Sequence, residues 1–230
     1  MLQQTQVERV LTKYELFLKE FSSFSTLARA RLKDVLAAWQ GLGYNKRAIA
    51  LKKIAEHVDH KLAGTLPSNY AALVELPGIG PATACAVLTF AFDIPTVFVE
   101  TNIRSVFLHT FFADERDVRD EKIYPLVECT LDRSNPRTWY YALMDYGAML
   151  KKHFGNPNRN SAYHTQQARF EGSNRQLRGE IISLILTDPE ITEADLALRL
   201  NADHQQISRN LRKLEAEGFF RRANARFIVG

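Results

Sequence analysis

The stretch Leu76-Pro77-Gly78-Ile79-Gly80-Pro81-Ala82-Thr83-Ala84 decides how the chain around it folds. A short helical pattern precedes it, and an apolar helical pattern with many small side chains follows it. Gly78 and Gly80 can take the positive φ angles that so short a turn requires, and they let a second backbone approach closely. Pro81 stands where a helix accepts proline best, at its first position.

This connection is a helix-hairpin-helix pattern. The N–H groups at the start of the second helix have no carbonyl partner within that helix, and the helix dipole adds positive charge there. We therefore expect one phosphate of a DNA backbone to bind at Gly78, Ile79, Gly80, Ala82 and Thr83, without any reading of base sequence. A Gly-x-Gly alone marks only a turn, whereas the full pattern between two helices indicates DNA binding.

The composition is that of a globular protein, with 230 residues, 46% hydrophobic and 24% charged. A net charge of +4 agrees with a nucleic-acid partner. Cys85 and Cys129 fall in apolar helical patterns, so we expect buried thiols and neither a disulfide framework nor a metal site. No apolar run is long enough for a membrane span, and no secretory segment opens the chain. We expect an intracellular location in the cytoplasm, at the nucleoid in a prokaryote, without a membrane partner.

A second turn of the same kind, Gly41-Leu42-Gly43-Tyr44, lies 37 residues before the first. The two units indicate a degenerate internal repeat, and we interpret the earlier turn mainly as a packing element. The apolar spacing from Val7 to Leu18 predicts a packed helix that starts at the first residue.

The chain divides into three parts by its composition and its hydrophobic pattern. Residues 1–155 are a helical domain, and residues 156–173 are a polar linker or wrapping arm without apolar period. Residues 174–230 show three helical patterns and a terminal pair of β segments, which together predict a winged helix. Its third helix is where DNA would be read. Because nine Lys or Arg residues stand against eight Asp or Glu residues there, a docking role remains an alternative.

Four segments, in this order, resemble the helix-hairpin-helix (HhH-GPD) DNA glycosylase superfamily: Met1-Leu2-Gln3-Gln4-Thr5-Gln6, Gly41 to Tyr44, Leu76 to Gly80, and Asn102-Ile103-Arg104. The Gln-Gln-Thr-Gln start and the stretch Met144 to Met149 resemble its MutY branch, the adenine glycosylases that act on A opposite oxidised guanine. The resemblance covers about residues 1–155. It implies an all-α fold of two helical lobes with a central helix-hairpin-helix and a substrate cleft between the lobes. It also implies a monomer that binds double-stranded DNA with a mispaired or damaged base.

Two departures from the family pattern concern cofactor and lyase chemistry. Family members usually end this domain with four cysteines around an iron–sulfur cluster, but here Lys151 to Gly155 runs into the polar arm without any. We expect a member without the cluster or another metal. In relatives that also cleave the strand, a lysine nucleophile lies two residues after the second hairpin glycine, where this chain has Ala82. No Schiff base can form there, so we expect no lyase activity.

A third departure concerns the catalytic carboxylate, which is Glu100 where the family motif carries aspartate. Loss of a purine leaves an oxocarbenium-like sugar, and a fixed negative charge beside it lowers the barrier. The longer side chain would shift the carboxylate by about 1.5 Å. The alternative is that Glu100 merely completes a helix start. Asn102 is expected to position water or backbone near it, or only to cap the helix.

The fourth departure is the general acid, a glutamate two residues before the Met of Met-Leu-Gln-Gln-Thr-Gln in the family. That position lies before Met1. We expect either an N-terminally truncated sequence or a form that has lost base excision.

The remaining site residues follow from their positions in the family pattern. Gln4 and Thr5 match residues that wedge beside the base left unpaired, and Tyr44 is expected to stack at that opening, an interaction worth about 1–3 kcal/mol. The expected phosphate contacts are Lys46, Arg47 and Arg104.

The resemblance thus implies a monofunctional DNA glycosylase of base excision repair, which hydrolyses the N-glycosidic bond of a flipped-out adenine mispaired with 8-oxoguanine or guanine. One alternative is a glycosylase of the same fold for T or U opposite G. Another is a non-catalytic DNA-binding protein, with the winged helix as sequence reader and the hairpin as clamp.

Overall fold

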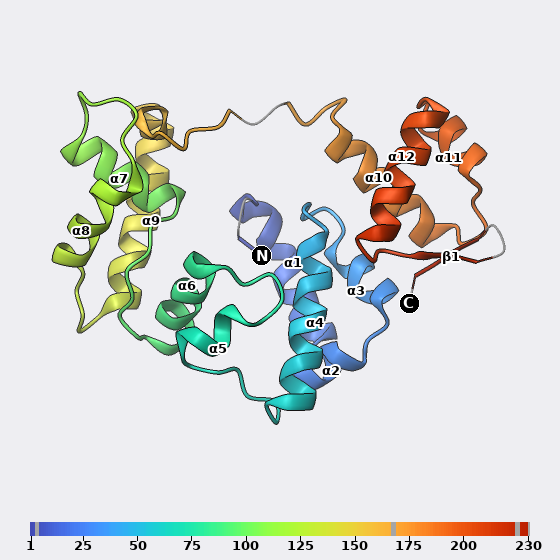
Figure 1. The fold of residues 1–230 in the computed structure, drawn as a ribbon, viewed down its shortest axis with the longest axis horizontal. Helices are drawn as coiled ribbons and strands as arrows, with labels where there is room; N and C mark the ends of the chain where they lie inside the picture. The colour runs from blue at the N-terminus through green and yellow to red at the C-terminus, as the bar shows by residue number, and fades with distance from the viewer. Residues whose placement is uncertain (3–4, 167–168, 224–225, 230) are drawn as a thin grey trace. The chain divides into compact units, whose positions relative to one another are not determined.

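The computed structural model describes residues 1–2, 5–166, 169–223 and 226–229, and these are mostly helical (Figure 1). The elements, in chain order, are α1 (Val7–Glu20), α2 (Phe24–Arg29), α3 (Leu32–Trp39), α4 (Lys46–Lys61), α5 (Tyr70–Val74), α6 (Pro81–Phe92), α7 (Thr101–Phe111), α8 (Asp120–Thr130), α9 (Pro136–His153), the 3₁₀ turn η1 (Pro157–Asn160), α10 (Asn174–Thr187), α11 (Glu193–Arg199), α12 (His204–Ala216), β1 (Arg221–Ala223) and β2 (Arg226–Ile228). The two strands pair antiparallel, with Arg222 opposite Phe227. The predicted all-α fold with a C-terminal winged helix and a small β-hairpin is confirmed.

The first helix begins later than its apolar spacing predicted. Helix α1 starts at Val7, and Gln6 before it has extended backbone angles. The prediction of a helix from the first residue was therefore wrong. Only part of the predicted apolar face packs, because Val10 and Phe17 are buried while Leu11 is 62% exposed.

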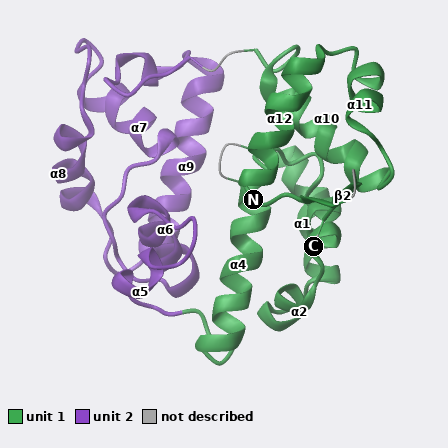
Figure 2. Cartoon of the chain, turned by 45° about the vertical axis from the view of Figure 1, so that its right-hand side comes forward, with its two compact units in different colours: residues 1–66, 168–230 green, residues 67–167 purple. Residues whose placement is uncertain are grey.

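The chain forms two compact units (Figure 2). Unit 1 comprises residues 1–66 and 168–230, and unit 2 comprises residues 67–167. These packing units divide the chain at other places than the sequence domains 1–155, 156–173 and 174–230, whose boundaries stay a prediction.

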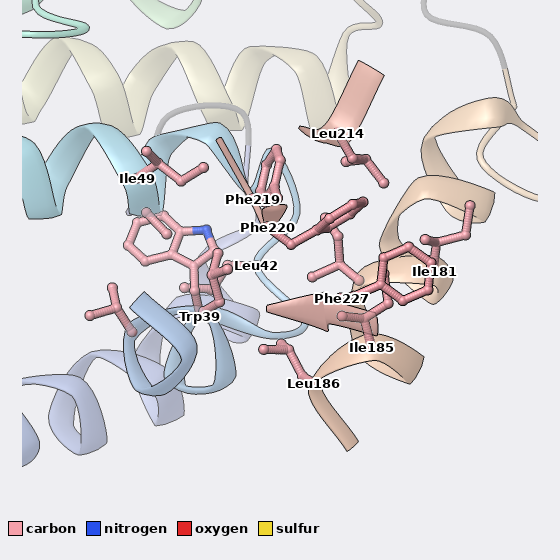
Figure 3. Packing of buried hydrophobic residues seen from close by; sticks show 14 of the residues in the cluster. Trp39, Leu42, Ile49, Ile181, Ile185, Leu186, Leu214, Phe219, Phe220 and Phe227 are labelled. Carbon is pink, nitrogen blue, oxygen red and sulfur yellow. The ribbon is translucent and has the colours of Figure 1, made fainter. Parts of the chain in front are cut away.

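Unit 1 has one hydrophobic core, to which both of its chain segments contribute. Trp39 and Leu42 belong to the same buried cluster as Ile181, Phe219 and Phe227 (Figure 3). Helix α12 contributes its apolar face to this cluster, and its opposite face carries charged side chains. The winged helix is thus docked on the N-terminal helices.

Polar contacts add to this docking at the surface. Lys46 of α4 lies 3.0 Å from Glu217, which follows α12 and also pairs with Arg178 of α10. Such partly exposed pairs each contribute at most about 1 kcal/mol, so the shared apolar core is the main source of stability here.

Unit 2 is built around α7, whose residues Ile103 and Leu108 are fully buried. The Tyr140 hydroxyl of α9 donates to the Thr96 carbonyl at 2.8 Å and accepts from the Phe98 amide at 3.3 Å. Burial raises the pKa of Tyr140 to about 12, so the hydroxyl stays a donor. These bonds fix the extended segment that leads into Glu100.

The first part of the predicted polar arm packs on unit 2. Asn158 of η1 is buried, and its Nδ2 donates to the Thr101 carbonyl at 3.1 Å and to the Ser105 hydroxyl. Ser161 forms a parallel bridge with Val118. Among the described residues, none of the helices has the length and apolar character needed to cross a bilayer.

Candidate functional site

The predicted hairpin joins α5 to α6 as expected, and the buried side chains of Leu73 and Leu76 anchor it to the core. Gly78 has a φ of 79°, in the left-handed region that favours glycine. The Ile79 amide donates to the Leu76 carbonyl at 3.1 Å and closes the turn. The glycines 78 and 80 are exposed, so the turn backbone is accessible from outside.

Gly80 differs from the expectation that both glycines need positive φ. Its φ is −89°, which any residue adopts, and it is the N-cap of α6. A Cβ built on Gly80 would meet nothing within 4 Å. The first hydrogen bond within α6 runs from the Ala84 amide to the Gly80 carbonyl at 2.9 Å. The backbone amides before Ala84 therefore precede the hydrogen-bonded part of the helix. Gly80 thus leaves open space before the start of α6 instead of shaping the turn.

Glu100 is the N-cap of α7. Its Oε1 accepts hydrogen bonds from the Asn102 amide at 2.7 Å and the Ile103 amide at 3.2 Å. Oε2 has no hydrogen-bond partner among the described residues. The helix-start role and a catalytic role are therefore compatible, because one oxygen fixes the carboxylate and the other remains available.

Asn102, two residues on, is held from α9. Its Oδ1 accepts a hydrogen bond from Lys151 Nζ at 2.7 Å. A Cβ built on Gly147 would lie 2.2 Å from the Asn102 carbonyl oxygen, so only glycine lets α9 approach α7 this closely. Burial lowers the pKa of Lys151, and the charge of Glu100 opposes this shift.

Sequence reasoning missed both contacts from α9. Lys151 reads as an ordinary basic residue in the last turn of a helix. A signal did exist at Gly147, because a glycine in the middle of a long helical pattern often marks a close backbone approach.

Arg104 was expected to contact phosphate, and the structure places it elsewhere. Its guanidinium donates twice to the Asp120 carboxylate, both times at 2.6 Å, and each side chain is 15% exposed. The bonds to Asp120 raise the pKa of Arg104. This ion pair links α7 to α8, and the Nε and Nη2 donors of Arg104 are already bonded to Asp120.

A separate group of predicted residues meets in unit 1 around the first Gly-x-Gly turn. Arg47 donates to the Thr5 hydroxyl at 2.8 Å and to the carbonyls of Leu42 and Gly43, each at 3.2 Å. The Thr5 hydroxyl donates to the Leu42 carbonyl at 3.0 Å. Burial lowers the pKa of Arg47. Arg47 therefore clamps the turn to the N-terminal segment, which is a different role from the expected phosphate contact.

Tyr44 ends this turn in an unusual conformation. Its φ is 47°, a region that bulky side chains rarely adopt, and its side chain is 39% exposed. Arg175 of α10 donates to its hydroxyl at 3.3 Å. Lys46, two residues further on, is exposed and pairs with Glu217. Gln4, the other expected wedge residue, lies outside the described residues.

The residues after α9 do not fit an iron–sulfur cluster. Such clusters need thiolates, whereas this segment has no cysteine and contacts α7 through the side-chain amide of Asn158. Cys85 lies half-buried on α6 and Cys129 lies exposed on α8, and both are free thiols, so the expectation of buried thiols was wrong. In the part of the chain that the structure describes, no group of three or more His, Cys, Asp or Glu side chains is placed to hold a metal ion.

Comparison with known families gives two matches. Residues 1–127 match the HhH-GPD superfamily of base excision DNA repair proteins, and residues 175–221 match a winged helix-turn-helix DNA-binding family. Among solved structures, a thermostable thymine-DNA glycosylase has a TM-score of 0.55 at 24% identity, covering 64% of this chain and 70% of that one. A trapped endonuclease III–DNA covalent intermediate has a TM-score of 0.54 at 18% identity, covering 64% and 68%. At these identities the likeness shows the fold alone.

Curated relatives are named adenine DNA glycosylase. The protein from Buchnera aphidicola subsp. Baizongia pistaciae is 34% identical over 151 residues, which cover 65% of this chain and 43% of the relative. The protein from Mycolicibacterium smegmatis is 30% identical over 251 aligned residues, which cover 100% of this chain and 84% of the relative. The chain thus spans less than half the length of the Buchnera relative and most of the mycobacterial one. It belongs to the HhH-GPD superfamily of base excision DNA repair proteins, in its MutY-like branch.

Proposed function

We propose that this protein is a monofunctional DNA glycosylase that removes adenine mispaired with 8-oxoguanine or guanine. The observation that carries the proposal is the carboxylate of Glu100, which two backbone amides hold at the start of α7 with Oε2 still available. The name of the curated relatives, adenine DNA glycosylase, supports adenine as the base.

The chemistry requires a fixed negative charge beside the sugar. As the N-glycosidic bond breaks, positive charge develops at the sugar C1′ and ring oxygen, and a preorganised carboxylate stabilises it. The two hydrogen bonds from backbone amides hold the Glu100 carboxylate in place, so it need not reorganise in the transition state. The base leaves with the bonding electron pair and takes up a proton, and water then adds to C1′ and releases a proton, so the net reaction is hydrolysis.

Duplex DNA with a mispaired base is the proposed partner. The target nucleotide must leave the stack, which costs a few kcal/mol. The exposed hairpin at Gly78 and Gly80 would hold a phosphate, and the exposed ring of Tyr44 would stack on a base left behind.

We also propose that the enzyme works as a monomer, without an iron–sulfur cluster and without lyase activity. The lack of cysteine in the segment after α9, and the contact of its Asn158 side chain with α7, support the first absence. Ala82 in the hairpin, where strand-cleaving relatives carry lysine, supports the second, because alanine cannot form a Schiff base.

The test is single-turnover excision on A:8-oxoG, A:G, T:G and U:G duplexes, with borohydride trapping of any covalent intermediate. We expect excision from the adenine duplexes and no trapped complex. Glu100→Gln keeps the shape and removes the charge, so it should lower the rate by at least about 10²-fold while leaving duplex affinity unchanged. Glu128→Gln, an exposed carboxylate on α8, is the matched control and should behave as wild type.

Two results would overturn the proposal. Excision confined to T:G or U:G duplexes would assign another base. Full activity of Glu100→Gln would remove that residue from the chemistry.

A further inference from the structure

Helix α9 contacts Asn102, two residues after Glu100, at two points on one face. Gly147 and Lys151 are four residues apart, so they stack on the same side of the helix. Gly147 meets the backbone of Asn102, and the ammonium of Lys151 meets its side-chain oxygen at 2.7 Å. The close approach at Gly147 sets the distance at which the lysine reaches the amide.

This contact has a defined direction. A lysine ammonium has three donors and no acceptor, so it can bond only the oxygen of an amide. With Oδ1 of Asn102 bound to Lys151, Nδ2 must point the other way. Among the described residues, Nδ2 of Asn102 has no hydrogen-bond partner, so its two donors remain available for a bound molecule.

Protein stability does not explain a cation at this place. Lys151 is half-buried, and no carboxylate of the described residues lies within ion-pair distance of its Nζ. Burial lowers the pKa of Lys151, and the charged groups that act on it are Glu100, which favours the ammonium, and Arg104, which disfavours it. A desolvated charge without an ion pair is a feature of functional sites more than of folding cores.

We propose that Lys151 is a positioning residue that fixes the amide of Asn102 so that Nδ2 donates to the sugar–phosphate of the extruded nucleotide beside Glu100. This inference rests on the proposed function. Lys151 itself touches neither substrate nor Glu100 in this role. It acts through the orientation of one amide.

The test compares three variants of α9 in the full chain. Lys151→Met removes the donor and the charge and keeps the length. Lys152→Met removes the same charge from the exposed neighbour and is the matched control. Lys151→Gln restores a donor to Oδ1 without the charge.

We expect Lys151→Met to lower the single-turnover rate by about 10- to 100-fold, the range in which a misplaced group changes catalysis. Its duplex affinity should equal that of Lys152→Met, and its melting temperature should not fall, because a desolvated charge has been removed. Lys151→Gln should recover most of the rate. Equal rates for Lys151→Met and Lys152→Met would overturn the proposal. A fall in both rate and melting temperature that Lys151→Gln does not rescue would assign a structural role instead.

A second readout separates this inference from the proposed function. The side-chain NH₂ signals of Asn102 in ¹⁵N NMR should shift in Lys151→Met and stay in place in Lys152→Met, whether or not the protein excises a base. A wild-type protein without excision would defeat the proposed function alone, whereas unchanged Asn102 signals in Lys151→Met would defeat the positioning role.

Discussion

The two Gly-x-Gly turns look alike in sequence and differ in construction. In the first, Gly41 and Gly43 have φ angles of 88° and 69°, and the carbonyl of Gly43 accepts from the indole of Trp39 at 3.1 Å and from Arg47 at 3.2 Å. In the second, Gly78 has a φ of 79° while Gly80 is extended. Both turns close on the same kind of backbone hydrogen bond, from the Leu42 amide to the Trp39 carbonyl at 3.2 Å and from the Ile79 amide to the Leu76 carbonyl at 3.1 Å. The first turn is clamped by side chains, and the second is accessible at its backbone.

The difference shows that one short motif can support two kinds of surface. In the first turn, side chains of the protein occupy the carbonyls, and what reaches solvent is the ring of Tyr44 in a conformation that only a firmly held turn maintains. In the second turn, small residues expose the backbone and a helix start. Under the proposed function, the first turn would stack on a base and the second would hold a phosphate.

The clamp gives the largest expected effect. Arg47→Met removes charged donors from the acceptors Met1, Thr5, Leu42 and Gly43. We expect the free energy of unfolding to fall by about 3 kcal/mol, measured by denaturant titration. Lys46→Met, on the exposed neighbour, should change it by less than about 1 kcal/mol. If the two variants were equally stable, the first turn would not depend on its clamp.

The second turn separates backbone strain from access. Gly78→Val forces a side chain into the left-handed region, which costs about 1–2 kcal/mol, and should lower stability and affinity for all duplexes alike. Gly80→Val fits the observed φ and the open space, so it should fold with wild-type stability and lose affinity only by blocking the helix start. Wild-type affinity of Gly80→Val would remove the hairpin from the DNA interface.

The smallest expected effect tests which exposed cations meet phosphate. Arg212 lies on the exposed side of α12, while Lys46 beside the first turn is paired with Glu217. If α12 contacts DNA, Arg212→Ala should make the slope of log affinity against log salt shallower by about 0.9, and Lys46→Met should leave it unchanged. An unchanged slope for Arg212→Ala, and for Arg209→Ala tested beside it, would leave α12 with a docking role alone.

Local signals in the sequence predicted the elements well. The hairpin, the helix starts and the winged helix follow from glycine and proline positions and from the apolar period, which act within a few residues. The role of Glu100 at a helix start was also predictable, because the extended segment before it and the helix after it are both local patterns.

Long-range contacts could not be predicted in this way. The hydrogen bond between Lys151 and Asn102 joins residues 49 positions apart, and nothing local in the sequence marks Lys151 as the partner of Asn102. Arg47 and Arg104 look like surface cations in the sequence. In the structure, Arg47 donates to the carbonyls of the first turn, and Arg104 donates to the carboxylate of Asp120. Charge type predicts that a guanidinium finds acceptors, but it does not predict whether they belong to DNA or to the protein.

The shared core of unit 1 has a consequence for the order in which the molecule is made. Unit 2 is one continuous stretch, so all its contacts can form as soon as residue 167 has left the ribosome. Unit 1 must wait, because Trp39 and Leu42 find Ile181, Phe219 and Phe227 only after the last helices are synthesised. Until then its early helices expose apolar surface, and a chain cut short before α10 keeps that surface exposed. Early termination would thus give a product marked for chaperones and proteases, and not a stable DNA-binding fragment.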